Sequence, residues 1–203
     1  TAGGRVRSKD LLGPAGPLML TRYRLAYPEA IRRAHLRDVE FLEDFPVLDA
    51  VYGYTRGQPN PGDSTLRPFR RAGGSLQIHG QLNHPEALLF HLKPDRVLRW
   101  LIAQGHHLAP TSDEQQSRVQ ILEAADIPRA GDIFDGQTLG TDLLRLIHSF
   151  SHRVMRRISA FCGIDRDSLS EYLVPQHLAF VVFAASRGDF VLGGLQALFE
   201  HDL

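Results

Sequence analysis

Apolar residues at helical spacing between residues 141 and 161 constrain the fold more than any other feature of the chain. They recur at steps of three and four: Leu143, Ile147, Phe150, Val154, Ile158 and Phe161. This spacing places them on one face of an α-helix, and such a face must be buried against another element. Gly163 follows where a helix C-terminal cap is expected. The sequence therefore predicts a long amphipathic helix that ends at this glycine.

The residues after this helix predict one buried strand between short helices. Residues 178–185 read LAFVVFAA, an apolar run typical of a buried strand. Before it, Asp165 or Asp167 can cap a short helix that continues through Leu169 and Leu173. After it, a turn is expected at residues 186–189, and the Gly193–Gly194 pair opens a last helix.

The first part of the chain mixes helix and strand patterns. A Gly- and Pro-rich arm is expected over residues 1–27. Helices are expected over 28–42, 94–105 and 111–125, the last with a Thr111-x-x-Glu114 capping box. Strands are expected over 47–55, 75–79 and 86–92, with a strong turn at 60–63.

These elements predict an α+β fold, with a small mixed sheet near 47–92, flanking helices and a helix-rich C-terminal part. Glycine and proline residues place a soft boundary in a linker over 127–140. We therefore expect an arm at 1–27, a mixed subdomain at 28–126 and a C-terminal domain at 141–203. The chain begins at Thr1 and ends soon after a helical pattern, so we expect it to be a fragment or one piece of a split protein.

Composition and charge narrow the possible functions. The 23 basic and 23 acidic residues cancel, whereas a strongly basic nucleic-acid binder carries a clear excess of positive charge. Any contact with DNA is therefore expected to be local. Lys9 and Lys93 are the only lysines. The other basic residues are arginine, which suits bidentate phosphate contacts but is also common in bacterial proteins encoded by GC-rich genes.

The sequence also limits the cellular compartment and the kinds of cysteine site that the chain can form. Cys162 is the single cysteine, which excludes an internal disulfide and a multi-cysteine zinc site within this chain. A lone cysteine suits a reducing compartment, and no apolar run is long enough to span a membrane. The N-terminal residues lack the apolar core of a signal peptide. We therefore expect a cytoplasmic protein with no membrane partner.

Common catalytic motifs are missing from the sequence. It contains no GxxxxGK[ST], GxGxxG or GxSxG pattern, so ATP hydrolysis by the usual P-loop route is not expected. Cys162 stands between Phe161 and Gly163, which favours a buried structural thiol. A nucleophilic role would require a base and an oxyanion donor that the sequence does not place. The chain is accordingly not expected to be an enzyme.

Two histidines leave one alternative open. His148 and His152 are four residues apart, a spacing that can bring two imidazoles to one metal ion. The zinc-protease motif requires a glutamate after the first histidine, and Ser149 stands there instead. The pair can equally serve packing and hydrogen bonding, or bind a metal with His106 or His177 as a third ligand. A metal-dependent hydrolase using His148 and His152 therefore remains an alternative.

Arginines and glycines provide the other candidate binding residues. Four arginines lie on the polar side of the long helix and can track phosphates or form an ordinary solvated face: Arg145, Arg153, Arg156 and Arg157. Gly193 and Gly194 allow either close approach of a phosphate or close packing of a helix on a strand, and we expect packing.

Three segments together resemble a known family: LLRLIHSFSHRVMRRISAFCGIDRDSLSEYL, LAFVVFAAS and LGGLQALFE. They are similar to the domain of unknown function found in DrmB-type proteins of the DISARM phage-defence system and at the C-terminus of related helicases. The residues that match in order and spacing are His148, His152, Cys162, Gly163, Ser168, Leu169, Gly193, Gly194 and Leu195. An upstream stretch fits less tightly, through Gly53, Tyr54, Thr55, Arg56 and Glu86.

The resemblance implies a non-catalytic DNA-binding or scaffolding component that partners a superfamily 2 helicase in bacterial antiphage defence. A helicase-linked DNA repair accessory domain is the nearest alternative. Members of the family carry a cysteine cluster beyond the Gly-Gly turn that is expected to bind zinc, and this chain ends before any such cluster. No cofactor is therefore expected in this chain, and zinc only in a missing segment.

Overall fold

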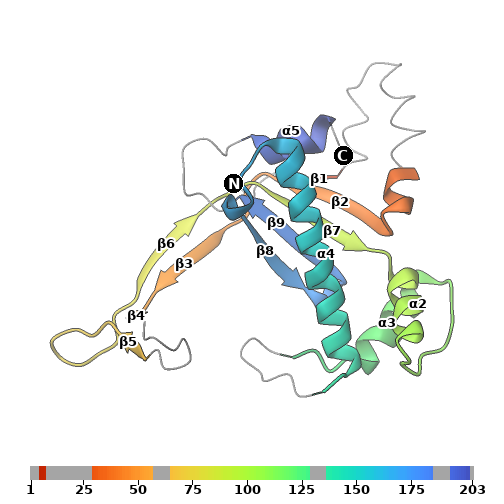
Figure 1. Cartoon of the computed structure of the whole chain (residues 1–203), viewed down its shortest axis with the longest axis horizontal. Coiled ribbons are helices and arrows are strands. Elements are labelled where there is room, and N and C mark those ends of the chain that lie inside the picture. The colour runs from red at the N-terminus through yellow and green to blue at the C-terminus, as the bar shows by residue number, and fades with distance from the viewer. Residues whose placement is uncertain (1–4, 8–28, 57–64, 129–135, 185–192, 202–203) are drawn as a thin grey trace. The chain divides into compact units, whose positions relative to one another are not determined.

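The computed structural model describes residues 5–7, 29–56, 65–128, 136–184 and 193–201 of the chain (Figure 1). The chain forms two compact units. The larger unit comprises Thr1–Phe45 and Pro85–Leu203, and the smaller unit comprises Pro46–His84.

A five-stranded antiparallel sheet organises the larger unit. Its strands follow the order β1 (Arg5–Arg7), β2 (Leu36–Leu42), β7 (Ala87–Leu92), β9 (Ala179–Ala184) and β8 (Leu169–Val174). The central pair joins β7 to β9, with Phe90 opposite Phe180. Directly opposed residues of a sheet share a face, so these two rings lie together and stack with centroids 5.0 Å apart.

Helix α4 (Leu139–Cys162) packs against one face of this sheet (Figure 1). Leu143, Ile147 and Ile158 of its apolar stripe are buried. Phe150 meets Phe180 edge to face, with ring centroids 5.8 Å apart. Gly163 caps the helix with φ of 67°, a left-handed conformation that glycine adopts without strain. The predicted long helix and its glycine cap are therefore confirmed.

Three further helices pack into the core of this unit. Helix α2 (Pro94–Ala103) and helix α3 (Glu114–Ala124) bury Leu98, Leu101 and Ile121. Helix α3 begins after Asp113, whose carboxylate accepts the Gln116 N–H, so Thr111 is not the cap that the sequence predicted. Helix α5 (Gly194–His201) buries Phe199, which stacks on Phe41 of β2. All three helices contribute side chains to the core that lies between the sheet and α4.

The smaller unit consists of two antiparallel ladders. Strand β3 (Val47–Val51) pairs with β6 (His79–Asn83), and β4 (Gly53–Thr55) pairs with β5 (Leu66–Pro68). No side chain among its described residues is buried. Several of its large apolar side chains are more than half exposed: Leu48, Val51, Leu76, Ile78 and Leu82. The unit therefore depends on its backbone ladders rather than on a core of its own.

The α+β prediction is confirmed, but several predicted elements are wrong. The ladders of the described residues are antiparallel rather than mixed, and the larger sheet takes strands from both ends of the chain. The helix expected over 28–42 ends at residue 33, because His35 adopts a φ of 58° and the next residues pair with β7. The expected strand at 75–79 lies instead at His79–Asn83.

The segment after the long helix also differs from its prediction. Instead of a helix through Leu173, a 3₁₀ turn (Arg166–Ser168) leads directly into β8. The division between the units does not fall in the linker expected at 127–140, since β7 and β9 pair across that linker. The turns expected at 60–63 and 186–189, and most of the 1–27 arm, lie outside the described residues.

In the part of the chain that the structure describes, no helix has the length and apolar character needed to cross a membrane.

We predict that Gly140→Ala destabilises the larger unit. A Cβ at this position would overlap the backbone carbonyl of Asp126, and neither group can rotate away because each is fixed by the backbone. Overpacking of this kind costs about 1–3 kcal/mol or more, which exceeds the gain in helix propensity. Urea unfolding measures the loss. Gly73→Ala is the control, because its Cβ would meet nothing within 4 Å. Equal stability of the two variants would contradict the close approach.

Candidate functional site

A groove runs along one edge of α4 in the larger unit. It consists of two adjoining hollows of about 410 and 570 Å³ that share four lining residues: Ala34, His35, Phe150 and Arg153. Helix α2 supplies Trp100, and the last turns of α4 supply Phe161. Phe161 is 65% exposed, so its ring is available to a ligand in the groove. We call this surface the basic groove.

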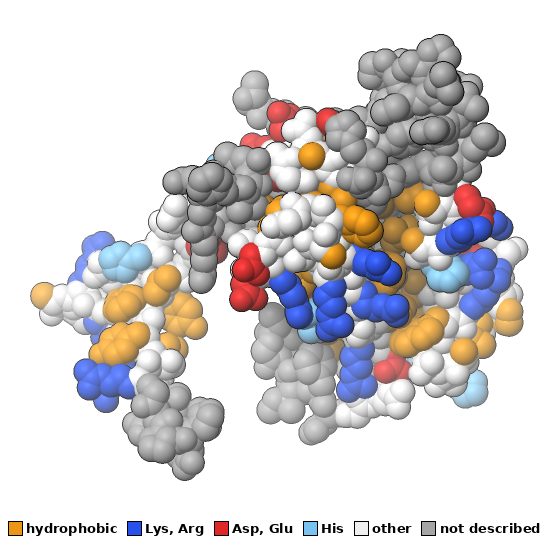
Figure 2. Space-filling view, turned by 45° about the horizontal axis from the view of Figure 1, so that its top comes forward, with side chains coloured by type: hydrophobic (Ala, Val, Ile, Leu, Met, Phe, Trp, Pro, Cys, Tyr) orange, Lys and Arg blue, Asp and Glu red, His pale blue; other side chains and the backbone are white. Residues whose placement is uncertain are grey.

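The charged side chains of the basic groove are arginines. Five of them line it, from three separate parts of the chain: Arg33, Arg96, Arg99, Arg153 and Arg157. Arg99 lies 3.4 Å from the Asp95 carboxylate, and Arg33 pairs with Glu29. Arg153 and Arg157 make no ion pair with the described residues. Figure 2 shows basic side chains gathered around apolar ones on this unit.

The structure separates the four arginines that the sequence grouped together. Arg153 and Arg157 line the basic groove. Arg145 lies 3.6 Å from the Asp142 carboxylate, beside His148 rather than in the groove. Arg156 is exposed and does not line the groove. Sequence reasoning missed Arg33, Arg96 and Arg99, because only the fold brings their segments to α4.

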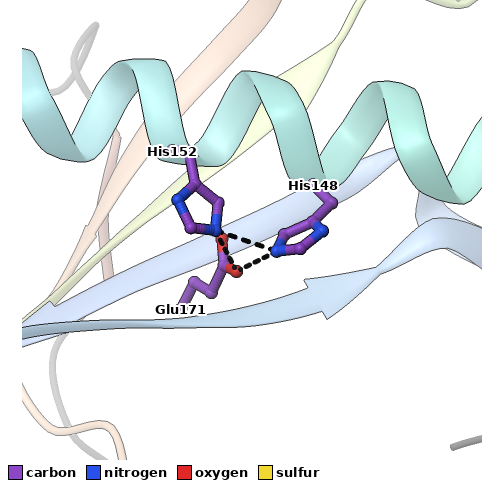
Figure 3. A group of neighbouring side chains, drawn as sticks. All are labelled: His148, His152 and Glu171. Atoms are coloured by element: carbon purple, nitrogen blue, oxygen red, sulfur yellow. Dashed lines mark hydrogen bonds and ion pairs between the residues drawn. The ribbon is translucent and has the colours of Figure 1, made fainter.

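A second cluster lies on the opposite side of α4, where the helix packs on β8. His148 and His152 come from successive turns of the helix and point toward Glu171 of the strand (Figure 3). The Glu171 Oε1 atom lies 3.0 Å from His148 Nε2 and 3.3 Å from His152 Nε2. The two ring nitrogens are 2.8 Å apart. These three side chains form the His–His–Glu cluster.

Ser151 supports the cluster from within the core. Its hydroxyl, which is fully buried, donates to Glu171 Oε2 and lies 2.7 Å from the His148 carbonyl oxygen. The carboxylate is therefore held by one oxygen while the other faces the histidines. Glu171 was missed because its segment was assigned to a helix. Its strand alternation, with Leu169 and Leu173 two residues away on either side, was the available signal.

Neither histidine proposed as a third metal ligand joins the cluster. His106 Nε2 lies 2.9 Å from Asp142 Oδ2, and the His177 ring lies 3.3 Å from the Arg118 guanidinium. Cys162 is partly buried and packs against the hydrophobic core, as a structural thiol would.

The two glycines at the start of α5 have different roles. Gly193 has φ of 90°, and a Cβ on Gly194 would come within 2.8 Å of the Ile164 side chain. Buried Glu86 accepts the Leu195 N–H at 2.8 Å, which places a carboxylate at the positive end of α5. Gly194 therefore allows close packing, against Ile164 rather than a strand, whereas Gly193 supplies the positive φ of the turn into the helix.

Asp142 anchors the first turn of α4. Burial acts to raise the pKa of its carboxyl, but hydrogen bonds from His106 and Gln137, with the nearby Arg145 charge, hold that pKa below its usual range. The ionised form is thus stabilised in the folded chain. Because Arg145 lies beside the ionised Asp142, part of its positive charge is already neutralised.

The sequence matches no model of a protein family, and a search of curated proteins finds no significant similarity. The site is therefore interpreted from its own geometry.

We predict that Asp142→Asn lowers stability at neutral pH by about 1–3 kcal/mol, since it removes a buried, hydrogen-bonded charge. A carboxyl with a lowered pKa stabilises the fold above its unfolded-state pKa, near 4, and loses that contribution as the pH falls through the folded-state pKa. The stability gap between the two proteins should therefore shrink below about pH 4. Urea unfolding across pH measures it.

Exposed Asp167→Asn is the matched control and should leave stability at neutral pH nearly unchanged. A gap between native chain and Asp142→Asn that stays constant from neutral to strongly acidic pH would contradict the electrostatic assignment.

Proposed function

We propose that this chain is a non-catalytic component that binds single-stranded DNA in the basic groove and acts beside a superfamily 2 helicase in bacterial antiphage defence. The observation that carries the proposal is the groove itself. It combines arginines with aromatic side chains, of which Phe161 is largely exposed and Trp100 partly so, and these are the two features with which proteins bind single strands without sequence preference.

The arginines of the groove match a phosphate backbone. Arg153 and Arg157 are one turn apart on α4, and Arg96 and Arg99 stand on α2. Guanidinium groups bind phosphate oxygens in a bidentate manner, and each neutralised phosphate releases bound counterions. A zero net charge does not prevent this, because the positive side chains are concentrated locally.

The aromatic side chains provide the second half of the recognition. Trp100 and Phe161 line the two hollows, and Phe161 is largely exposed. Bases stack on such rings with about 1–3 kcal/mol per base, whatever their sequence. Stacking requires unpaired bases, which favours a single strand over a duplex.

The helicase partnership is supported by the resemblance of residues 143–198 to the domain that accompanies helicases. A helicase releases single strands, and the basic groove is suited to hold one. A helicase-linked repair module would use the groove in the same way. The genes next to this one are expected to include a helicase, and co-purification of the tagged chain with it tests the partnership. Persistent failure to co-purify would contradict it.

We predict that Arg153→Ala/Arg157→Ala weakens binding to a labelled 20-nucleotide single strand by about tenfold or more in fluorescence anisotropy. The slope of log affinity against log salt should fall by about 1.4, since each lost phosphate contact removes about 0.7. Trp100 is the only tryptophan of the chain, so its intrinsic fluorescence should be quenched as a base stacks on it.

A matched variant separates the groove from the rest of the helix. Arg145→Ala/Arg156→Ala removes the same charge from the same helix but leaves the groove intact, and it should bind almost as the native chain does. Equal loss of binding in the two double variants, or binding without any change in Trp100 fluorescence, would place the DNA elsewhere. A duplex of the same sequence should bind more weakly.

A further inference from the structure

We propose that the His–His–Glu cluster binds a divalent transition-metal ion, with Zn²⁺ as its best fit. The ligands are His148 Nε2, His152 Nε2 and Glu171 Oε1. The proposal does not depend on DNA binding, since none of the three residues lines the basic groove.

The spacing of the three donor atoms fits one metal ion. Zinc binds imidazole nitrogen and carboxylate oxygen at about 2.0–2.2 Å, so neighbouring ligand atoms of a tetrahedral shell stand about 3.3–3.6 Å apart. The three separations here are 2.8, 3.0 and 3.3 Å. An expansion of the triangle by a few tenths of an ångström therefore makes room for an ion that contacts all three atoms.

Hydrogen bonds alone do not account for this triangle. Each imidazole nitrogen has a single valence in the ring plane, which carries either a proton or a lone pair. Each Nε2 atom here nevertheless has two partners, the other Nε2 and the shared Oε1. All three contacts cannot be satisfied by protons at the same time. A metal cation accepts one lone pair from each of the two Nε2 atoms and from Oε1, so a single ion satisfies all three atoms.

Glu171 is held in place by its surroundings, as metal ligands usually are. Glu171 is 18% exposed and its second oxygen is held by the buried Ser151 hydroxyl. Such hydrogen bonds to a ligand fix its orientation and are typical of metal sites. The histidine side chains are more open, at 54% for His148 and 36% for His152. The remaining coordination positions thus face solvent, where water or a small ligand can occupy them.

The donor set decides the class of metal. Two imidazoles and one carboxylate suit zinc and other first-row transition ions. Calcium and magnesium prefer a shell made of oxygen atoms, which this cluster does not supply. Because the ligands come from α4 and β8, the ion would join the helix to the edge strand of the sheet.

The proposal is tested on the full chain after it has been stripped with a chelator. Titration with Zn²⁺ in competition with a chromophoric chelator should give one site per chain, and bound Zn²⁺ should raise the melting temperature. Co²⁺ should give the visible absorption of a low-symmetry nitrogen–oxygen site. His148→Ala, His152→Ala and Glu171→Gln should each abolish the Co²⁺ spectrum and weaken Zn²⁺ binding by about 100-fold or more, since each removes a direct ligand.

Two further variants sharpen the outcome. Ser151→Ala leaves all three ligands in place and should weaken Zn²⁺ binding by about 10–100-fold, the usual effect of losing a supporting hydrogen bond. His107→Ala removes an exposed histidine outside the cluster and should bind as the native chain does.

Two results would overturn the proposal. One is a native chain that binds Zn²⁺ no more tightly than the His148→Ala/His152→Ala variant. The other is a native chain whose melting temperature is the same with and without the ion. Either result would mean that the three side chains do not hold a metal ion. DNA binding by the stripped chain is measured in parallel, so that failure of one proposal is distinguished from failure of the other.

Discussion

The pairing of β7 with β9 is the constraint on which the larger unit depends. It joins segments about ninety residues apart and places Phe90 against Phe180 at the centre of the sheet. The apolar stripe of α4 then packs onto these rings through Phe150. Strands β2 and β8 add on either side, and β8 brings Glu171 beneath the helix. Both candidate sites therefore depend on one non-local strand pair.

Local patterns predicted the helices better than the strands. The apolar stripe of α4 and the Gly163 cap lie within one continuous segment, so the sequence alone was enough to locate them. Residues 36–42 could not be assigned in this way, because their apolar spacing suits a helix as well as a strand and only the partner β7 decides. Residues 169–173 failed for the same reason. That error concealed Glu171, while the histidine pair on the predicted helix was visible from the start.

The two faces of α4 explain how one helix can carry two chemistries. His148 and Arg157 are nine residues apart, which at 3.6 residues per turn is two and a half turns. They therefore point to opposite sides of the helix, with the buried stripe between them on the inner side. Arg145 and Arg156 occupy the outer side, which contacts neither β8 nor the groove. The sequence placed all four arginines on one polar face, but the fold divides that face among three environments.

Neutral net charge and a basic groove are compatible because no acidic residue is among the described residues that line the groove. Asp142 is held by His106 and Gln137, and Asp95 faces Arg99 from a buried position. Glu171 faces the histidines on the far side of the helix. None of these carboxylates lines the groove, so none of them neutralises the positive charges of Arg153 and Arg157. A helix with its side chains is about 10–12 Å wide, close to the screening length of physiological salt, so a cation bound at the cluster would add little to that field. Any influence of the metal on DNA binding would have to pass through the position of α4 itself, which the cluster ties to β8.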